Sequence, residues 1–356
     1  MSLRSEIRGR GAKSNPKNRF ERFSLENFPD DEPYIYSEED DEIKIPTQFF
    51  VDDSKTVIAK NDSYDVGFNY SVNPYRGCEH GCIYCYARPS HEFLGFSSGT
   101  DFESKIIVKK DAPKLLEAEF SKKNYKPDFI MFSGDTDCYQ PIERKLKLTR
   151  EVLKVCLKYR NPVTIVTKNE LVLRDTDIIK EMAELDLISV CFSIVTLNRS
   201  LARKMEPRTS SPERRLETIG KLAEKKIPVG VNIAPVIPGL TDQEIPLILK
   251  EASLHGAVFA GHSMLRLPYA VKELFLEWLK KELPGKESKI VNKIREMRDG
   301  KLNESEFGVR FSGKGELAEA IHSLFEISCR KYGLNREIVK LRTDLFRRAA
   351  DQLEIF

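Results

Sequence analysis

The chain has 356 residues, and its 58 Lys and Arg side chains nearly balance its 55 Asp and Glu side chains. That length supports one large domain with additions and ample core, and the net charge of +3 neither requires nor excludes a nucleic-acid partner. The sequence has no apolar run long enough to span a bilayer and no apolar stretch typical of a secretory signal near its start. We therefore expect neither a membrane protein nor an exported one.

Charge is unevenly distributed over the first part of the chain. Residues 1–25 carry seven basic and two acidic side chains, whereas residues 26–43 carry nine acidic side chains and no basic one. Such blocks are typical of solvated or disordered tails, so residues 1–45 are predicted to be a charged, flexible N-terminal arm. Two alternatives remain open: the basic part contacts a phosphate backbone, or the arm packs onto the domain with Phe20 and Phe23 as anchors.

From residue 67 onward, strand-like apolar runs alternate with helix-like segments. The predicted strands cover residues 67–73, 128–134, 162–168, 187–195, 228–237 and 258–267, and the predicted helices between them cover residues 144–159, 175–185, 212–226 and 242–255. This alternation implies an α/β protein with a parallel sheet, either doubly wound or closed into a barrel.

Distinctive polar residues at the ends of the predicted strands favour a barrel. Lys168 ends the third strand, Ser193 lies in the fourth and Arg266 in the sixth, and parallel barrels assemble their active sites at the carboxyl ends of strands. The prediction is a partial (β/α)6 barrel of the TIM type over residues 46–270, with an open side for a large substrate. Residues 271–356 are predicted to be a C-terminal helical extension, with amphipathic helices at 271–283, 286–298, 315–332 and 335–349.

Three cysteines, Cys78, Cys82 and Cys85, are spaced C-x3-C-x2-C. Four thiolates would complete a structural zinc site or an electron-transfer cluster, whereas three thiolates on a [4Fe–4S] cluster leave one iron open to a small molecule. The alternative is a zinc site completed by His80 or His91, although the sequence has no second C-x2-C or H-x3-H cluster. The pattern favours the iron–sulfur cluster.

The seven cysteines do not suggest a disulfide framework, because their number is odd and three of them are crowded together. Cys156, Cys191 and Cys329 lie in helical or apolar segments and are expected to be small core residues. A reducing, cytoplasmic compartment fits this cysteine usage best.

The cysteines belong to a longer motif, N-P-Y-R-G-C-E-H-G-C-I-Y-C-Y-A-R over residues 73–88. Further motifs are R-G-R-G-A (8–12), S-G-D-T-D-C-Y-Q-P-I-E (133–143), T-K-N-E-L-V-L-R-D (167–175), S-I-V-T-L (193–197) and P-V-I-P-G-L-T-D-Q-E (235–244). On these motifs the sequence resembles the radical S-adenosylmethionine (SAM) superfamily, and within it the branch of spore photoproduct lyase and relatives labelled "DNA repair photolyase". The resemblance is stronger for the cofactor chemistry than for the substrate, because such families share a radical generator and differ in what they attack.

The resemblance implies a [4Fe–4S] cluster on Cys78, Cys82 and Cys85, with SAM chelated to its open iron. An electron from a reductant such as flavodoxin or ferredoxin would cleave SAM, and the resulting 5′-deoxyadenosyl radical would take a hydrogen atom from the substrate. In this chemistry the cofactor does the difficult step, while the protein orients the reactants and excludes water.

The resemblance also implies roles for side chains around SAM. Tyr84 would lie beside the adenine, Lys168 would pair with the SAM carboxylate, and Ser193 would contact the ribose. The place of the motif that binds the methionyl amino group is occupied by Ser133, Gly134 and Asp135, although the usual Gly-Gly-Glu is absent. The structural alternatives are ordinary packing for Tyr84, an ion pair with an acid for Lys168 and an internally bonded hydroxyl for Ser193.

Two further residues, Arg208 and Cys138, are candidates for the functional site. Arg208 would either hold a carboxylate or phosphate, or pair with Glu206. Cys138 is the candidate catalytic residue, because spore photoproduct lyase has a cysteine on the corresponding loop that returns a hydrogen atom to the product radical. Cys138 is displaced from that position by several residues, which argues against repair of the spore lesion itself.

Three functions remain open from the sequence. The first is a radical SAM enzyme, of lyase or repair type, that acts on DNA or another nucleic acid. The second is the same chemistry on a protein, peptide or metabolite, and the third is a zinc-stabilised binding module without catalysis. Metal content separates the third from the others, because a cluster brings about four irons and four sulfides per chain and a zinc site brings a single zinc.

Overall fold

The computed structural model describes residues 6–7, 9–20, 42–43 and 45–348. Its centre is a seven-stranded sheet with the order β12-β11-β10-β9-β8-β5-β4. These strands are β4 (Ile58–Lys60), β5 (Tyr70–Val72), β8 (Ile130–Phe132), β9 (Val163–Thr167), β10 (Ile188–Ser193), β11 (Val229–Val236) and β12 (Phe259–Met264). All neighbouring strands are parallel except β4 and β5, which are antiparallel.

The six parallel strands follow one another across the sheet in chain order, and each lies within one of the six predicted strands. The residues of β10 are all buried, as expected for a central strand covered on both faces. In the described part of the chain, β12 and β4 are the two edges of the sheet and do not pair with each other. The predicted α/β partial barrel is therefore confirmed.

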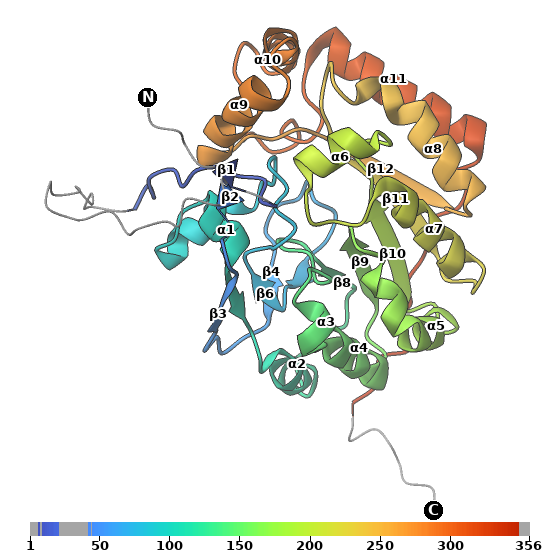
Figure 1. The fold of residues 1–356 in the computed structure, drawn as a ribbon. Helices are drawn as coiled ribbons and strands as arrows, with labels where there is room; N and C mark the ends of the chain where they lie inside the picture. Colours follow the sequence, from blue (N-terminus) through green and yellow to red (C-terminus); the bar gives the residue numbers. More distant parts are fainter. Residues whose placement is uncertain (1–5, 8, 21–41, 44, 349–356) are drawn as a thin grey trace, which may run out of the picture.

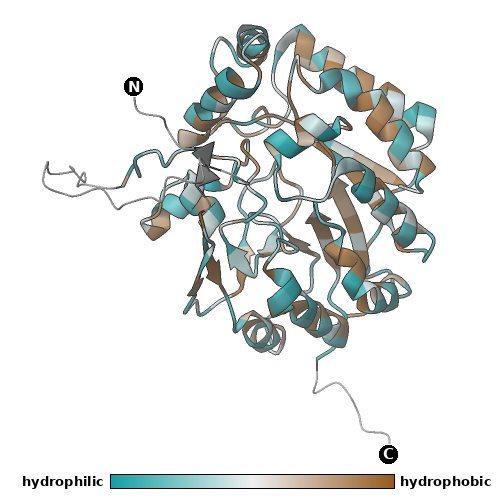
Figure 2. Ribbon diagram, viewed as in Figure 1, coloured by the Kyte–Doolittle hydropathy of each residue, from teal (hydrophilic) through white to brown (hydrophobic). Residues whose placement is uncertain are grey.

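Helices cover the outer face of this sheet (Figure 1). They are α2 (Ala112–Phe120), α4 (Leu148–Tyr159), α5 (Thr176–Ala183), α7 (Pro212–Ala223) and α8 (Ile245–Leu254). Figure 2 shows the apolar strands enclosed by helices with hydrophilic outer surfaces. The predicted helix at 144–159 is interrupted, because Lys147 has a φ of 53° and separates α3 (Glu143–Leu146) from α4.

A smaller lobe, which the sequence did not predict, carries the cysteines. Its three-stranded sheet has the order β3-β7-β6, formed by β3 (Gln48–Val51), β7 (Lys105–Val108) and β6 (Tyr75–Arg76). The cysteine loop, residues 77–87, connects β6 to the 3-10 helix η1 (Arg88–Leu94), and α1 (Thr100–Ser104) follows. The N–H of Cys78 donates to the Phe102 carbonyl at 2.9 Å, which ties the loop to α1.

Residues 9–20 of the predicted N-terminal arm pack against this lobe. Arg10 is only 2% exposed, and its guanidinium donates to the Ile45 carbonyl at 2.7 Å. Phe20 is one of the expected anchors, and the centroid of its ring lies 4.9 Å from that of Phe93 in η1. The other expected anchor, Phe23, lies outside the described residues. A two-stranded sheet of β1 (Glu6–Ile7) and β2 (Glu42–Ile43) joins two short pieces of the same region.

The C-terminal region contains α9 (Ala270–Glu282), α10 (Glu287–Glu296) and α11 (Gly315–Tyr332), close to three of the predicted helices. The fourth, at 335–349, is wrong for residues 335–348, which form no helix. Gly333 ends α11 with a φ of 73°, and the Asn335 side chain then bonds the backbone of Ala260 in β12 at 2.8 and 3.0 Å. In the described residues, no helix is long and apolar enough to cross a lipid bilayer.

Candidate active site

A cavity of about 590 Å³ lies at the carboxyl ends of the parallel strands. Nine of the predicted site residues line it: Cys78, Cys82, Tyr84, Cys85, Ser133, Gly134, Asp135, Lys168 and Ser193. They come from loops after different strands, as the barrel prediction requires. The lining also includes Arg266 and two residues that were not selected as site residues from the sequence, Asp137 and Arg310.

Tight turns at two glycines determine the backbone conformation of the cysteine loop. Gly77 and Gly81 have φ of 76° and 68°, and a Cβ on Gly81 would lie 2.7 Å from a carboxylate oxygen of Glu103. Cys78 and Cys82 are 6% and 8% exposed, Cys85 is half-buried, and all three are free thiols. The loop therefore presents three free thiols to one cavity.

Glu103 is a buried carboxylate that joins the cysteine loop to the N-terminal segment. Its Oε1 lies 2.5 Å from Nη2 of Arg88, and both side chains are fully buried. The carboxylate also accepts the N–H groups of Gly11 and Ala12 at 2.9 and 2.8 Å. A Cβ on Gly11 would lie only 1.8 Å from the carbonyl oxygen of Gly81. The R-G-R-G-A segment thus closes directly onto the cysteine loop.

The donor set fits an iron–sulfur cluster better than the zinc alternative. Both histidines considered as a fourth zinc ligand have other partners: His91 Nε2 lies 2.9 Å from the Lys105 carbonyl, and His80 contacts Asp137 and Asn169. Burial raises the pKa of all three thiols, so a metal must displace protons when it binds. In the described part of the chain, no three His, Cys, Asp or Glu side chains are already arranged around one metal position. Three thiols without a fourth protein ligand are the set that leaves one iron open.

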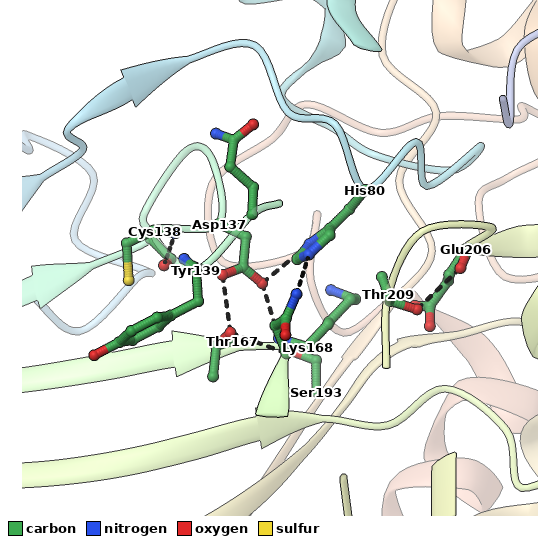
Figure 3. Close-up of polar contacts among 12 residues, drawn as sticks. His80, Asp137, Cys138, Tyr139, Thr167, Lys168, Ser193, Glu206 and Thr209 are labelled. Carbon is green, nitrogen blue, oxygen red and sulfur yellow. Dashed lines mark hydrogen bonds and ion pairs between the residues drawn. The ribbon is translucent and has the colours of Figure 1, made fainter. Parts of the chain in front are cut away.

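Asp137 organises the polar network beside the cysteine loop (Figure 3). Its carboxylate accepts Thr167 Oγ1 and the Lys168 N–H, both at 2.8 Å, and lies 3.3 Å from His80 Nδ1. Asn169 Nδ2 lies 3.1 Å from His80 Nε2, and the Asn169 Oδ1 accepts a backbone N–H. Burial opposes ionisation, but His80 and the backbone N–H groups hold the pKa of Asp137 at about 2. The signal in the sequence was its place in the loop after the second predicted strand.

Lys168 follows β9 and lines the cavity. In the residues that the structure describes, no acidic oxygen lies within 4.0 Å of its ammonium, so the alternative of a structural ion pair is not formed. Burial lowers its pKa, but the nearby Cys82 and Glu206 outweigh this and raise the pKa above its ordinary value. Lys168 is therefore a cation that faces the cavity and is suited to an anionic ligand.

Tyr84 and Ser193 are held by one buried ion pair. The Tyr84 hydroxyl donates to one oxygen of Glu206, and Arg215 binds the other. The second amino group of Arg215 donates to the Ser193 carbonyl at 2.7 Å. Arg215 and Glu206 were not selected from the sequence as a pair, because only the fold brings α7 to the carboxyl end of β10.

The loop after β8 has an unusual backbone at the position of the expected amino-binding motif. Ser133 has a φ of 69°, and the Asp135 N–H donates to the Asn73 side chain at 2.9 Å. Burial raises the pKa of Asp135 to about 6, against the opposing charges of Lys109 and Arg76. Asp135 therefore titrates close to neutral pH.

Two predicted site residues do not line the cavity. Cys138 is fully buried in the main core, and the Thr149 hydroxyl donates to its carbonyl at 2.6 Å. Arg208 lies 3.5 Å from Glu79, with 34% of its side chain exposed, and does not pair with Glu206. The fold thus separates both residues from the other nine.

The region after β12, together with one residue of the cysteine loop, contributes a second group of cavity residues. We call Tyr86, Arg266, Arg310 and Phe311 the β12 corner. Arg310 binds Asp65 through two nitrogens at 2.5 and 2.8 Å. The guanidinium of Arg266 lies 4.9 Å from the ring of Phe311 and 6.0 Å from that of Tyr86.

Comparison with known sequences matches a protein family and several relatives. A family model described as "Radical SAM superfamily" matches residues 72–252. The uncharacterized protein Rv2578c of Mycobacterium tuberculosis is 32% identical over 232 residues, which cover 65% of this chain and 67% of that protein. The uncharacterized protein MJ0683 of Methanocaldococcus jannaschii is 35% identical over 178 residues, which cover 50% of this chain and 64% of that protein.

Solved structures share the fold. Spore photoproduct lyase complexed with dinucleoside spore photoproduct matches with a TM-score of 0.58 and 17% sequence identity over 80% of each chain. A mutant of the same enzyme, with bound AdoMet and dinucleoside spore photoproduct, matches with a TM-score of 0.57 and 16% identity over 83% of this chain and 81% of that one. At this identity the likeness establishes the fold.

Proposed function

We propose, from the premise that the chain belongs to the radical SAM superfamily, that it abstracts a hydrogen atom from a nucleic-acid substrate. The protein is an enzyme, and its cofactors are the [4Fe–4S] cluster and SAM that this superfamily uses. The observation that carries the proposal is one cavity lined by the three thiols of the cysteine loop and by Lys168. A soft ligand set and a cation for a carboxylate are what these two cofactors require.

Each side chain in the cavity would have a defined task. Cys78, Cys82 and Cys85 would hold the cluster, and Lys168 would bind the SAM carboxylate. When bound, the two cofactors supply the 5′-deoxyadenosyl radical that takes the hydrogen atom. The support for these assignments is that all four residues line the same cavity and that Lys168 has no carboxylate partner among the described residues.

Further residues would orient SAM. Tyr84 would lie beside the adenine, with its ring held by the hydroxyl bond to Glu206, and Ser193 would contact the ribose. The loop of Ser133, Gly134 and Asp135 would receive the amino group, and an ionised Asp135 would attract it electrostatically. Because the backbone of this loop and the Tyr84 hydroxyl are already bonded within the protein, little rearrangement would be needed.

Two observations support a nucleic acid as substrate. The chain shares its fold with spore photoproduct lyase, which was solved with a dinucleoside spore photoproduct. The β12 corner adds cationic and aromatic side chains to the cavity, as nucleotide sites require. The proposal does not extend to the spore lesion itself, because Cys138 does not line the cavity.

The test is anaerobic purification followed by metal analysis and SAM cleavage. We expect about four irons and four sulfides per chain, and 5′-deoxyadenosine after addition of SAM and a low-potential reductant. DNA oligonucleotides should increase the yield, and deuterium from a labelled oligonucleotide should appear in the 5′-deoxyadenosine. One zinc per chain without iron would refute the enzyme chemistry, and stimulation by a peptide pool instead of DNA would refute the substrate class.

A further inference from the structure

The β12 corner contains a half-buried arginine, Arg266, that has no acidic partner among the described residues. Arg266 lines the cavity, and its Nε is buried without a hydrogen-bond partner. In the described residues, no acidic oxygen lies within 4.0 Å of its guanidinium. Burial and the neighbouring Arg310 lower the pKa of Arg266, which reflects the cost of holding this charge without an anion.

The neighbouring charges do not supply that anion. Arg310 engages both carboxylate oxygens of Asp65, and Asp65 also accepts the Gly308 N–H at 3.0 Å. A third guanidinium, Arg298, donates to the Leu265 carbonyl at 2.5 Å and leaves its Nη1 without a partner. Among the described residues, Asp65 is the only acid within 4.0 Å of any of these three guanidinium groups, and Glu304 acts on Arg298 from a greater distance. The corner therefore has an excess of positive charge.

Aromatic faces flank the same guanidinium. Phe311 is fixed to the strand edge, because its carbonyl accepts the Met264 N–H at 2.8 Å. Tyr86 is 50% exposed although it lines the cavity, and its hydroxyl donates to the Gly134 carbonyl at 2.6 Å. The Tyr86 ring is therefore held in one orientation with part of its surface free, which suits stacking of a planar ring.

We propose that the β12 corner is the nucleotide subsite of this cavity, where Arg266 binds a phosphodiester of the substrate strand and Tyr86 stacks on the adjacent base. This inference rests on the proposed function and names the residues that recognise its substrate. A phosphate accepts two hydrogen bonds from a planar guanidinium, and an exposed ring beside it takes a base without sequence preference. A carboxylate would satisfy Arg266 but would leave the stacking surface without a role, so nucleic acid is favoured over an acidic peptide.

The test is direct binding, measured by fluorescence anisotropy with a labelled single-stranded oligodeoxynucleotide and the anaerobically reconstituted full chain. Arg266→Gln should weaken binding about 10- to 100-fold and lower the slope of log K against log salt by about 1, as expected for one lost phosphate contact. Arg266→Lys should leave the salt slope unchanged but reduce the affinity for the oligonucleotide, because the positive charge remains while bidentate hydrogen bonding to the phosphate is lost. The matched control is Arg330→Gln on the exposed face of α11, which should change neither quantity.

The stacking half is tested by a pair of substitutions at Tyr86. Tyr86→Leu should weaken binding by a similar factor but leave the salt slope unchanged, whereas Tyr86→Phe should bind nearly as well as the parent. Equal affinity and slope in Arg266→Gln and Arg330→Gln would overturn the proposal, as would stronger, Arg266-dependent binding of a labelled acidic peptide. Iron content and substrate-free SAM cleavage are measured on the same samples, so a failed subsite with intact cleavage is distinguishable from failure of the proposed chemistry.

Discussion

Two regions beside the cavity differ in whether their charged side chains are paired. Behind the cysteine loop, Glu103 is bonded by Arg88 and by two backbone N–H groups of the N-terminal segment. At the β12 corner, Arg266 has neither an acid nor a hydrogen-bond partner for its Nε in the described part of the chain. Arg88 is fully buried, whereas Arg266 is half-buried and lines the cavity.

The difference separates structural charges from ligand-binding charges. A buried ion pair with its remaining hydrogen bonds satisfied needs nothing further, and its loss is felt as instability. A half-buried cation without a partner has lost part of its hydration, so the empty site is higher in energy, and an anionic ligand recovers that energy. By this criterion Glu103 and Arg88 are structural charges of the cysteine loop, whereas Arg266 and Lys168 are the residues that we propose bind ligands.

The largest effect is expected at the cysteine loop itself. Cys78→Ala should abolish both the bound iron and the formation of 5′-deoxyadenosine, because two thiols cannot hold the cluster. Cys156→Ala, a fully buried core cysteine of α4, should leave both unchanged. Iron and sulfide analysis with chromatographic detection of 5′-deoxyadenosine measures the two properties, and normal iron in Cys78→Ala would remove that residue from the ligand set.

The next largest effect is expected at the Glu103–Arg88 ion pair behind the cysteine loop. Glu103→Gln should lower the free energy of unfolding by about 3–5 kcal/mol, because Arg88 would remain as an uncompensated buried charge. Glu117→Gln is the matched control, since its ion pair with Lys158 is exposed and should contribute less than about 1 kcal/mol. Urea denaturation followed by circular dichroism gives both values. Equal losses in the two variants would show that the Glu103 network does not hold the lobe.

A smaller effect is expected for the cation facing the cavity. Lys168→Ala should weaken SAM binding about 10- to 100-fold, as expected for loss of one hydrogen bond to a charged group. The urea concentration at the midpoint of unfolding should be unchanged or higher. Lys250→Ala, at an exposed position of α8, provides the comparison. Calorimetric titration with SAM under anaerobic conditions measures the affinity. Normal SAM affinity would exclude Lys168 as the carboxylate ligand.

The smallest effect is a pH dependence of stability from Asp135. Its folded pKa of about 6 lies above the ordinary aspartate value of 3.8, so the folded state binds the proton more tightly. Stability from this group is therefore fully present below pH 3.8 and is lost as the pH rises to about 6, by at most about 3 kcal/mol and by less because the side chain is partly exposed. Asp135→Asn should remove this decline in SAM-free protein, as measured by urea unfolding from pH 4 to 7. The oppositely shifted Asp137 does not interfere, because with a pKa of about 2 it acts below pH 3.8.

Local patterns in the sequence were sufficient to predict much of this protein. The cysteine spacing, the six apolar strands and the polar residues at their carboxyl ends all depend on neighbours within a few positions. They predicted the parallel sheet and nine residues of one cavity. They failed at 335–348, where the periodicity of a helix was present but the chain bonds the edge of β12 instead.

Only the tertiary structure decided which charges are paired. Glu103 meets the Gly11 N–H across 92 positions, and Arg310 meets Asp65 across 245. No local pattern encodes such contacts, because they depend on how the lobe, the arm and the sheet edges pack together. The sequence predicted that Arg10 belongs to a solvated basic tail, yet this side chain is buried. In the sequence, Arg266 was only one of several polar residues near the ends of predicted strands. That Arg266 lacks an acidic partner among the described residues could be established only from the tertiary structure, because the free energy of a charge depends on all the groups that replace its hydration water.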